Sequence, residues 1–215
     1  MNNWKRRVID AGIRMLDEGI TIGTWGNVTL RDPETGYVYL SPSGMPYRTL
    51  AEDDIVVVRL DGSRVEGKRK PTIETEMHLA IYRARPGCNA VIHTHPIYST
   101  AFSAMGEDIP LLLDEAAQVL GDTVRTAEYA LPGTMELAEN CVKALGKKSM
   151  ACLLKSHGAV CLGETLEQAF GNSTVLEATA QVYSIIRSMG GKFEPISPEN
   201  IAAMQDFVKN SYGQR

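Results

Sequence analysis

Apolar residues recur along the chain with two different spacings, and each spacing predicts a different element. Segments with apolar residues at every third or fourth position favour amphipathic helices, and short apolar runs bounded by Gly, Pro or Asp favour strands. The expected helices cover residues 3–18, 74–83, 134–145, 166–186 and 198–209. The expected strands cover residues 28–31, 38–40, 55–60, 63–65, 90–93 and 150–155, and residues 211–215 form a tail.

The order of these elements indicates the type of sheet. Residues 55–60 and 63–65 flank Asp61-Gly62, a pair typical of a tight hairpin, whereas helices separate the later strands. Hairpins combined with helical connections predict an α/β fold with a mixed or mostly antiparallel sheet that is covered by helices. No repeat, low-complexity segment or long linker interrupts the sequence, so we expect residues 1–215 to form a single domain.

The composition argues against several classes of protein. With 44% hydrophobic and 22% charged residues, the chain has the balance of an ordinary globular protein. Its net charge of −4 argues against nucleic acid or an anionic membrane as the main partner. No apolar run approaches the ~18 residues of a membrane span, and no apolar signal core follows the basic N-terminal residues. The four cysteines form no CxxC pair and have apolar flanks, so we expect reduced thiols in a cytoplasmic protein.

Three of the four histidines stand at the ends of apolar strands. His93 and His95 are two residues apart, a spacing that puts both side chains on one side of a strand. His157 ends the next buried strand and precedes a glycine. Three neutral imidazoles with one open position are the ligand set of a catalytic zinc ion. A single histidine more often caps a strand end through a local hydrogen bond, but two strand ends that each carry histidine favour a metal site.

Three short segments of small and hydroxyl residues point to an anion site. They cover residues 23–27, 41–44 and 70–74. Backbone N–H groups in such turns form a concave nest for phosphate, although each segment alone is more often an ordinary turn. Glu74 is expected in the first turn of the following helix, where its charge suits the helix dipole. The alternative is that Glu74 only stabilises the helix through its dipole and has no role in a site.

Five motifs together resemble the class II aldolase/adducin family in their order and spacing. They are Gly26-Asn27-Val28-Thr29-Leu30-Arg31, Ser41-Pro42-Ser43-Gly44, Thr72-Ile73-Glu74, His93-Thr94-His95 and Ser156-His157-Gly158. The resemblance extends from the first expected helix to the long helix at 166–186. It implies a three-layer α/β/α domain with a central, mostly antiparallel sheet, assembled as a fourfold-symmetric homotetramer.

The resemblance also implies a metal centre at a subunit interface. It would hold Zn²⁺ or another divalent metal, one per chain, on the residues that match the family's ligands: His93, His95 and His157. Glu74 falls at the position of the family's acidic metal neighbour and catalytic base. His78 follows one turn later on the same helix face and is expected to have a supporting or packing role. The positions that match the family's phosphate site are Gly26, Asn27, Ser43, Gly44 and Thr72.

Two departures from the family pattern concern the phosphate site and the proton donor. Ile73 stands where a second hydroxyl residue often precedes the acid. In the family's aldolases a tyrosine of a neighbouring subunit donates a proton, and Asp114 occupies that position here. The tail containing Tyr212 resembles that of the family's epimerases, whose tyrosine acts across an interface. Tyr212 is therefore the expected acid, with Asp114 and Glu115 as alternatives.

The implied reaction is reversible cleavage of a small ketose 1-phosphate, similar to L-fuculose 1-phosphate, to dihydroxyacetone phosphate and an aldehyde. Zinc would polarise the ketone and Glu74 would transfer the proton. A 4-epimerase of the L-ribulose 5-phosphate type, or a dehydratase or decarboxylase, would need the same metal chemistry. Adducin-like modules on this fold are not catalytic. Because the three histidines and Glu74 are all present, we expect an enzyme that binds a phosphorylated sugar.

Overall fold

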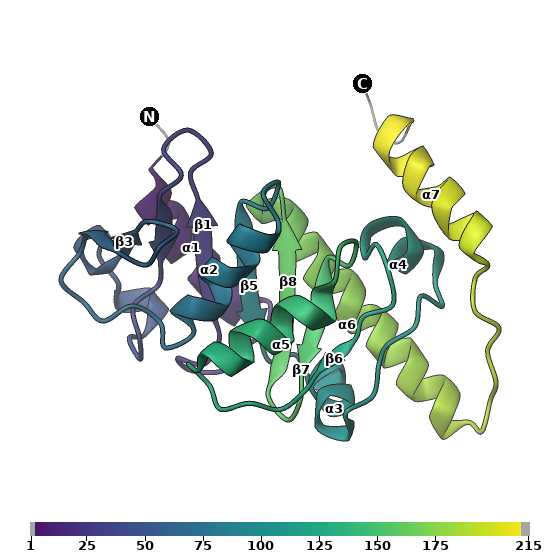
Figure 1. Ribbon diagram of the computed structural model, residues 1–215. Coiled ribbons are helices and arrows are strands. Elements are labelled where there is room, and N and C mark those ends of the chain that lie inside the picture. Colours follow the sequence, from purple (N-terminus) through teal and green to yellow (C-terminus); the bar gives the residue numbers. More distant parts are fainter. Residues whose placement is uncertain (1–2, 212–215) are drawn as a thin grey trace.

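The computed structural model describes residues 3–211, and its centre is one sheet of eight strands in the order β4-β3-β2-β1-β5-β8-β7-β6 (Figure 1). The strands are β1 (Asn27–Arg31), β2 (Val38–Leu40), β3 (Val56–Val58), β4 (Arg64–Glu66), β5 (Ala90–Thr94), β6 (Thr126–Ala127), β7 (Ala151–Leu154) and β8 (Gly158–Gly163). Every neighbouring pair is antiparallel except β6 and β7. This confirms the expected mixed, mostly antiparallel sheet.

Helices cover both faces of the sheet, which gives the three layers that were expected. They are α1 (Trp4–Asp17), α2 (Thr75–Ala84), α3 (Ile97–Met105), α4 (Asp114–Val119), α5 (Met135–Leu145), α6 (Leu166–Ser188) and α7 (Pro198–Asn210), with two short 3₁₀ turns, η1 (Tyr47–Thr49) and η2 (Glu52–Asp54). One apolar cluster lies between the sheet and α1, α3, α4 and α6, and a second lies between the sheet and α2 and α5. Alternate strand residues feed the two clusters because successive side chains point to opposite faces: Ile92 joins the first and Val91 the second.

The helices begin close to the expected residues because their N-caps are encoded locally. The side chains of Asn3, Thr134, Thr165 and Ser197 each accept a hydrogen bond from a backbone N–H three residues later. Such caps satisfy N–H groups that the first turn of a helix leaves free. Capping is a short-range signal, so it can be recognised without knowing the tertiary structure.

The largest error of the sequence prediction is the missing strand β8, which lies in the middle of the sheet. The turn between β7 and β8 has no Gly-rich hairpin sequence, and Ser156 takes the left-handed conformation with φ 56°. Helix α3 holds this turn from outside: Ser156 N–H donates to Ser103 O (3.0 Å), and His157 N–H donates to Ser103 Oγ (3.1 Å). The hairpin therefore depends on a tertiary contact. The short elements α3, α4 and β6 were also not predicted, and β3 is shorter than the run 55–60 that predicted it.

The last two helices differ from the rest in their burial. Helix α6 was expected to be buried on most sides, but its buried residues end at Ala180 and Ile185 is 47% exposed. Helix α7 has no buried residue and lies beside α4, where the Gln205 side chain donates to Ala117 O and Gly121 O (Figure 1). Within residues 3–211, no helix is both long and apolar enough to cross a membrane. The four cysteines are buried free thiols.

Candidate active site

One end of the sheet collects the polar segments that the sequence singles out. Because neighbouring strands run in opposite directions, the end of β5 meets the starts of β1 and β8, and Asn27 is paired with His93. A cavity of about 540 Å³ opens at this end. Its lining comprises Thr24, Trp25, Gly26, Asn27, Pro42, Ser43, Gly44, Thr72, Ile73, Glu74, His93, His95, Pro132, Ser156 and His157.

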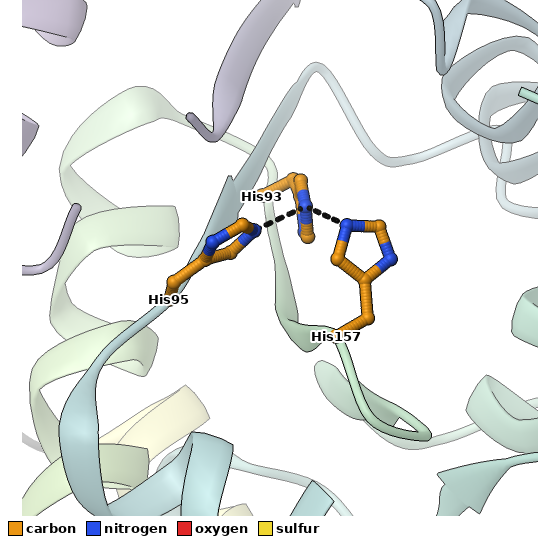
Figure 2. Close-up of side chains that lie close together, drawn as sticks. All are labelled: His93, His95 and His157. Carbon is orange, nitrogen blue, oxygen red and sulfur yellow. Dashed lines mark hydrogen bonds between the residues drawn. The ribbon is translucent and has the colours of Figure 1, made fainter. Parts of the chain in front are cut away.

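The three histidines converge in this cavity (Figure 2). His93 is on β5, His95 follows that strand, and His157 is in the turn before β8. The Nε2 atom of His93 lies 3.0 Å from that of His95 and 3.2 Å from that of His157. Ligands of a tetrahedral zinc ion with Zn–N bonds of 2.0–2.1 Å lie about 3.3 Å apart. The imidazole nitrogens thus have the spacing of a metal-ligand set.

The hydrogen bond behind the His93 ring decides which nitrogen faces its neighbours. His93 Nδ1 donates to Ala159 O at 3.0 Å, so Nε2 carries a lone pair rather than a proton. One lone pair accepts one hydrogen bond, yet this atom has two imidazole nitrogens within reach. Burial lowers the pKa of His93, His95 and His157 to about 4, so all three rings are neutral at pH 7. A cation bound between the rings would accept the His93 Nε2 lone pair and explain why two further imidazole nitrogens lie so close to this atom.

Glu74 supplies the negative charge of the site. The sequence predicted Glu74 in the first turn of the helix. It is instead the N-cap residue of α2, and its side chain does not cap the helix. The carboxylate is 3% exposed, with Oε2 3.4 Å from His93 Nε2 and Oε1 3.3 Å from His157 Nε2. Asn27 Nδ2 donates to Oε2 at 2.6 Å, whereas Oε1 has no hydrogen-bond partner. A buried carboxylate with a free oxygen beside three neutral imidazoles fits a divalent cation well.

Two glycines allow the backbone to pass close to the histidines. A Cβ atom on Gly158 would lie 2.5 Å from Thr94 O and 2.6 Å from His95 Cδ2. Gly26 has φ 77°, and a Cβ atom there would lie 2.7 Å from His93 O. Any larger side chain at either position would push against the β5 segment that holds the metal ligands.

The predicted anion-binding segments also line this cavity. Loops 41–44 and 70–74 are paired through backbone bonds, with Ser43 N–H donating to Lys70 O (3.0 Å) and Thr72 N–H to Ser41 O (3.0 Å). Gly26, Ser43, Gly44 and Thr72 all line the cavity. Asn27 also lines it, but its side-chain amide lies between Glu74 and His78. Beside these polar residues, Ile73 and Trp25 expose apolar side chains.

Two of the three candidate proton donors, Asp114 and Glu115, do not line this cavity. Asp114 and Glu115 open helix α4, where both are exposed, and neither lines the cavity of its own chain. Tyr212 lies outside the described residues.

Two residues behind Asn27 were not singled out from the sequence. Thr29 Oγ1 lies 2.8 Å from His78 Nδ1 and 2.8 Å from the Tyr82 hydroxyl, all inside the apolar layer between β1 and α2. Burial, followed by the charge of His93, lowers the pKa of His78 to about 3, so this ring is neutral. Their spacing could have identified them from the sequence. Thr29 is two residues after Asn27 on a strand, and Tyr82 is four residues after His78 on a helix, so each pair shares one face of its element.

Comparison with known proteins gives consistent matches over nearly the whole chain. Residues 6–184 match the family model described as the Class II Aldolase and Adducin N-terminal domain. A 5-deoxy-D-ribulose 1-phosphate aldolase of Bacillus thuringiensis serovar kurstaki is 34% identical over 98% of this chain and 97% of that protein. The L-fuculose phosphate aldolase of Escherichia coli K12 is 35% identical over 100% and 97%. A solved L-fuculose 1-phosphate aldolase has a TM-score of 0.92 at 33% identity, with 97% of each chain covered.

We expect each of His93→Ala, His95→Ala and His157→Ala to lose most of the bound divalent metal. Each change removes one of three converging nitrogens, and the large core should keep the melting temperature close to that of the unchanged protein. Metal content by mass spectrometry after gel filtration checks this. His78→Gln, at the one histidine outside the triad, is the matched control and should retain metal. Full occupancy in all three alanine variants would refute the site.

The pH dependence of zinc binding provides a second check on the same site. Since burial lowers the pKa of these rings to about 4, they stay neutral as pH falls from 7.5 to 5.5 and protonate only near pH 4. A histidine with the ordinary pKa of about 6.5 would lose roughly tenfold in free-ligand concentration over that interval. Titration of the metal-free protein with Zn²⁺ should therefore show little weakening at pH 5.5. Steep weakening that begins at pH 6.5 would contradict the burial of the rings.

Proposed function

The chain belongs to the class II aldolase and adducin family and is an aldolase, and we propose that it reversibly cleaves a small ketose 1-phosphate to dihydroxyacetone phosphate and an aldehyde. One observation carries the proposal: a buried carboxylate with a free oxygen lies beside converging imidazoles, in a cavity that Gly26, Ser43, Gly44 and Thr72 also line. The relatives named for L-fuculose phosphate and 5-deoxy-D-ribulose 1-phosphate support a substrate of this size and charge.

We assign His93, His95 and His157, with Glu74 beside them, to one Zn²⁺ or similar divalent ion per chain. When bound, the ion supplies a Lewis acid that polarises the substrate carbonyl and stabilises the charge that develops as the C3–C4 bond breaks. Glu74 Oε1, which has no hydrogen-bond partner, removes a proton from the hydroxymethyl carbon of dihydroxyacetone phosphate in condensation and returns it to that carbon in cleavage. The C4 hydroxyl proton of the ketose passes to the separate group that serves the aldehyde oxygen.

The residues that bind the phosphate also orient the substrate. The phosphate group is bound by Gly26, Ser43, Gly44 and Thr72 through hydroxyl and backbone N–H groups. Anchoring the phosphate there presents the other end of the sugar to the histidines, so the reacting bond is held beside Glu74. Ile73 replaces one hydroxyl of the usual phosphate pocket, which leaves the Ile73 backbone N–H as its contribution. Asn27, expected among the phosphate ligands, uses its side chain to hold the base instead.

The acid that serves the aldehyde oxygen is supplied by a neighbouring subunit of a homotetramer. Tyr212 is the first candidate, and Asp114 with Glu115 is the alternative. Asp114 and Glu115 are exposed and do not line the cavity of their own chain, which supports a role at the cavity of another chain. The exposed helix α7 leads to Tyr212.

The test of the proposed reaction is release of dihydroxyacetone phosphate from a panel of substrates. L-fuculose 1-phosphate, 5-deoxy-D-ribulose 1-phosphate and the unphosphorylated ketoses are incubated with the zinc-loaded enzyme, and the product is detected by NADH-linked reduction. Cleavage of at least one 1-phosphate and none of the free sugars is expected. Interconversion of pentulose 5-phosphates without release of a triose phosphate would instead identify a 4-epimerase.

Replacing the base without changing its shape should abolish turnover selectively. Glu74→Gln removes the proton acceptor, and general bases contribute about 10²–10⁴-fold, so kcat should fall by that factor while KM changes little. Steady-state kinetics with measured metal content checks this. Glu76→Gln is the control, since that exposed carboxylate lies two residues away and pairs with Arg83. If Glu74→Gln stays within a fewfold of the unchanged kcat, another group removes the proton.

The identity of the acid is decided by paired variants. Tyr212→Phe removes one hydroxyl and should leave the melting temperature nearly unchanged, while turnover falls at least ~10²-fold, the lower range for acid–base catalysis. Hybrid tetramers of Tyr212→Phe and His93→Ala chains should regain partial activity, because each intact half-site comes from a different chain. A deletion that begins at Ser211 and keeps full activity would eliminate Tyr212. Asp114→Asn would then be the damaging change.

A further inference from the structure

We propose that His78, Thr29 and Tyr82 form a buried hydrogen-bonded relay that fixes the direction of the Asn27 amide and, through it, the position of the Glu74 carboxylate. The three are positioning residues, since none of them lines the cavity. The inference rests on the proposed function only in giving Glu74 the role of base. The relay itself is a structural claim about which atoms donate and which accept.

The relay exists because a helix and a strand have matching repeats at this point. Helix α2 carries His78 and Tyr82 four and eight residues after Glu74, and four residues of helix rise about 6 Å. Strand β1 carries Asn27 and Thr29 two residues apart, which is about 6.6 Å along a strand. The strand side chains therefore alternate with the helix side chains along one line between the two elements.

The contacts follow that line without a gap. From Glu74, Asn27 Nδ2 donates to Oε2 at 2.6 Å, and Asn27 Oδ1 makes a short contact with His78 Nε2. His78 Nδ1 lies 2.8 Å from Thr29 Oγ1. The Tyr82 hydroxyl donates to Thr29 O at 2.9 Å and also lies 2.8 Å from Thr29 Oγ1. His78, Thr29 and Tyr82 are at most 1% exposed, so water cannot take the place of any partner.

Each member of the relay then has one possible role. An ionised carboxylate only accepts, so the Asn27 NH₂ group must face Glu74 and its carbonyl oxygen must face His78. That oxygen requires the proton of the neutral ring on Nε2, which leaves a lone pair on Nδ1. The Thr29 hydroxyl donates to this lone pair. The Thr29 hydroxyl, acting as donor, thus stabilises the Nε2-protonated tautomer of His78, and that tautomer stabilises the amide orientation that the Glu74 carboxylate requires.

The orientation has a consequence for the base. With the NH₂ group on Oε2, the bound oxygen of Glu74 is the one near His93, and the free oxygen is the one 3.3 Å from His157. A reversed amide would turn its carbonyl oxygen toward the carboxylate and repel it. A wholly apolar contact between α2 and β1 would pack this layer without three buried polar groups, which are costly unless fully paired. Their full pairing indicates that the relay serves the amide.

Kinetics of matched variants test the relay. Thr29→Val keeps the shape and removes the donor, and His78→Leu removes the ring, so both should lower kcat by about tenfold or more while KM and metal content change less than twofold. His78→Gln can restore an N–H donor toward Asn27 and should recover most of the kcat lost in His78→Leu. Thr179→Val is the control: it removes an equally buried hydroxyl, which donates to Val175 O on α6, and should leave kcat unchanged.

Several kinetic results would overturn the proposal. Thr29→Val or a folded His78→Leu with unchanged kcat would remove its basis. The proposal would also fail if a folded, metal-loaded His78→Gln were as impaired as His78→Leu, because an N–H donor toward Asn27 would then have no effect on kcat. If His78→Leu does not fold, the decision passes to Thr29→Val, because valine suits a strand.

The tautomer of His78 can be read without any activity, which separates failure of the relay from failure of the proposed reaction. The chain has only four histidines, so selective ¹⁵N labelling gives four imidazole signal sets, and His78→Gln identifies one of them. In the metal-free protein at pH 7.5 we expect His78 to be protonated on Nε2 alone, and Thr29→Val to disturb that state while Thr179→Val does not. Protonation on Nδ1 in the unchanged protein would overturn the relay even if the enzyme cleaves every ketose phosphate offered. The expected tautomer in a protein without aldolase activity would support the relay and refute only the reaction.

Discussion

Burial of the Glu74 carboxylate against three neutral imidazoles is the constraint on which the rest of the site depends. None of the described residues that line the cavity is Lys or Arg, so no side-chain cation balances this charge. Leaving a charge unpaired in such a place is strongly unfavourable, and a divalent ion is the compensation that suits nitrogen and oxygen ligands.

Contacts outside the cavity hold the side chains of the site in place. Ala159 O fixes the tautomer of His93, and Ser103 on α3 holds the turn that carries His157. Because Gly158 has no Cβ, β8 can approach the ring of His95. These supports come from helix α3 and from strand β8, so the arrangement of the three histidines depends on tertiary packing rather than on any one segment. A metal centre held in this way pre-organises its ligands before the ion arrives.

The parts of this arrangement that are encoded over a few residues could be predicted from the sequence, and the parts that depend on packing could not. His93 and His95 share one side because of the strand repeat, and the helix starts follow from local caps such as Thr134 and Ser197. By contrast, strand β8 depends on a left-handed Ser156 that a distant helix holds in place, which no local pattern reveals. The sequence placed Asn27 with its small neighbours in an anion nest, but its side-chain contacts with Glu74 and His78 join different elements, so no local pattern reveals them.

The two halves of the proposed reaction are therefore supported very differently by the protein. The base side is closed: Glu74, Asn27 and the residues behind them are buried and hydrogen-bonded to one another in a single pattern. On the acid side, the two described candidates, Asp114 and Glu115, are exposed on α4 and do not line the cavity of their own chain. Breaking a carbon–carbon bond next to a carbonyl needs the base and the metal in one fixed geometry, whereas the group that serves the departing aldehyde must match the size of that aldehyde. A scaffold that buries the first and keeps the second outside the buried hydrogen-bonded group can accept a different aldehyde without disturbing Glu74 and its partners.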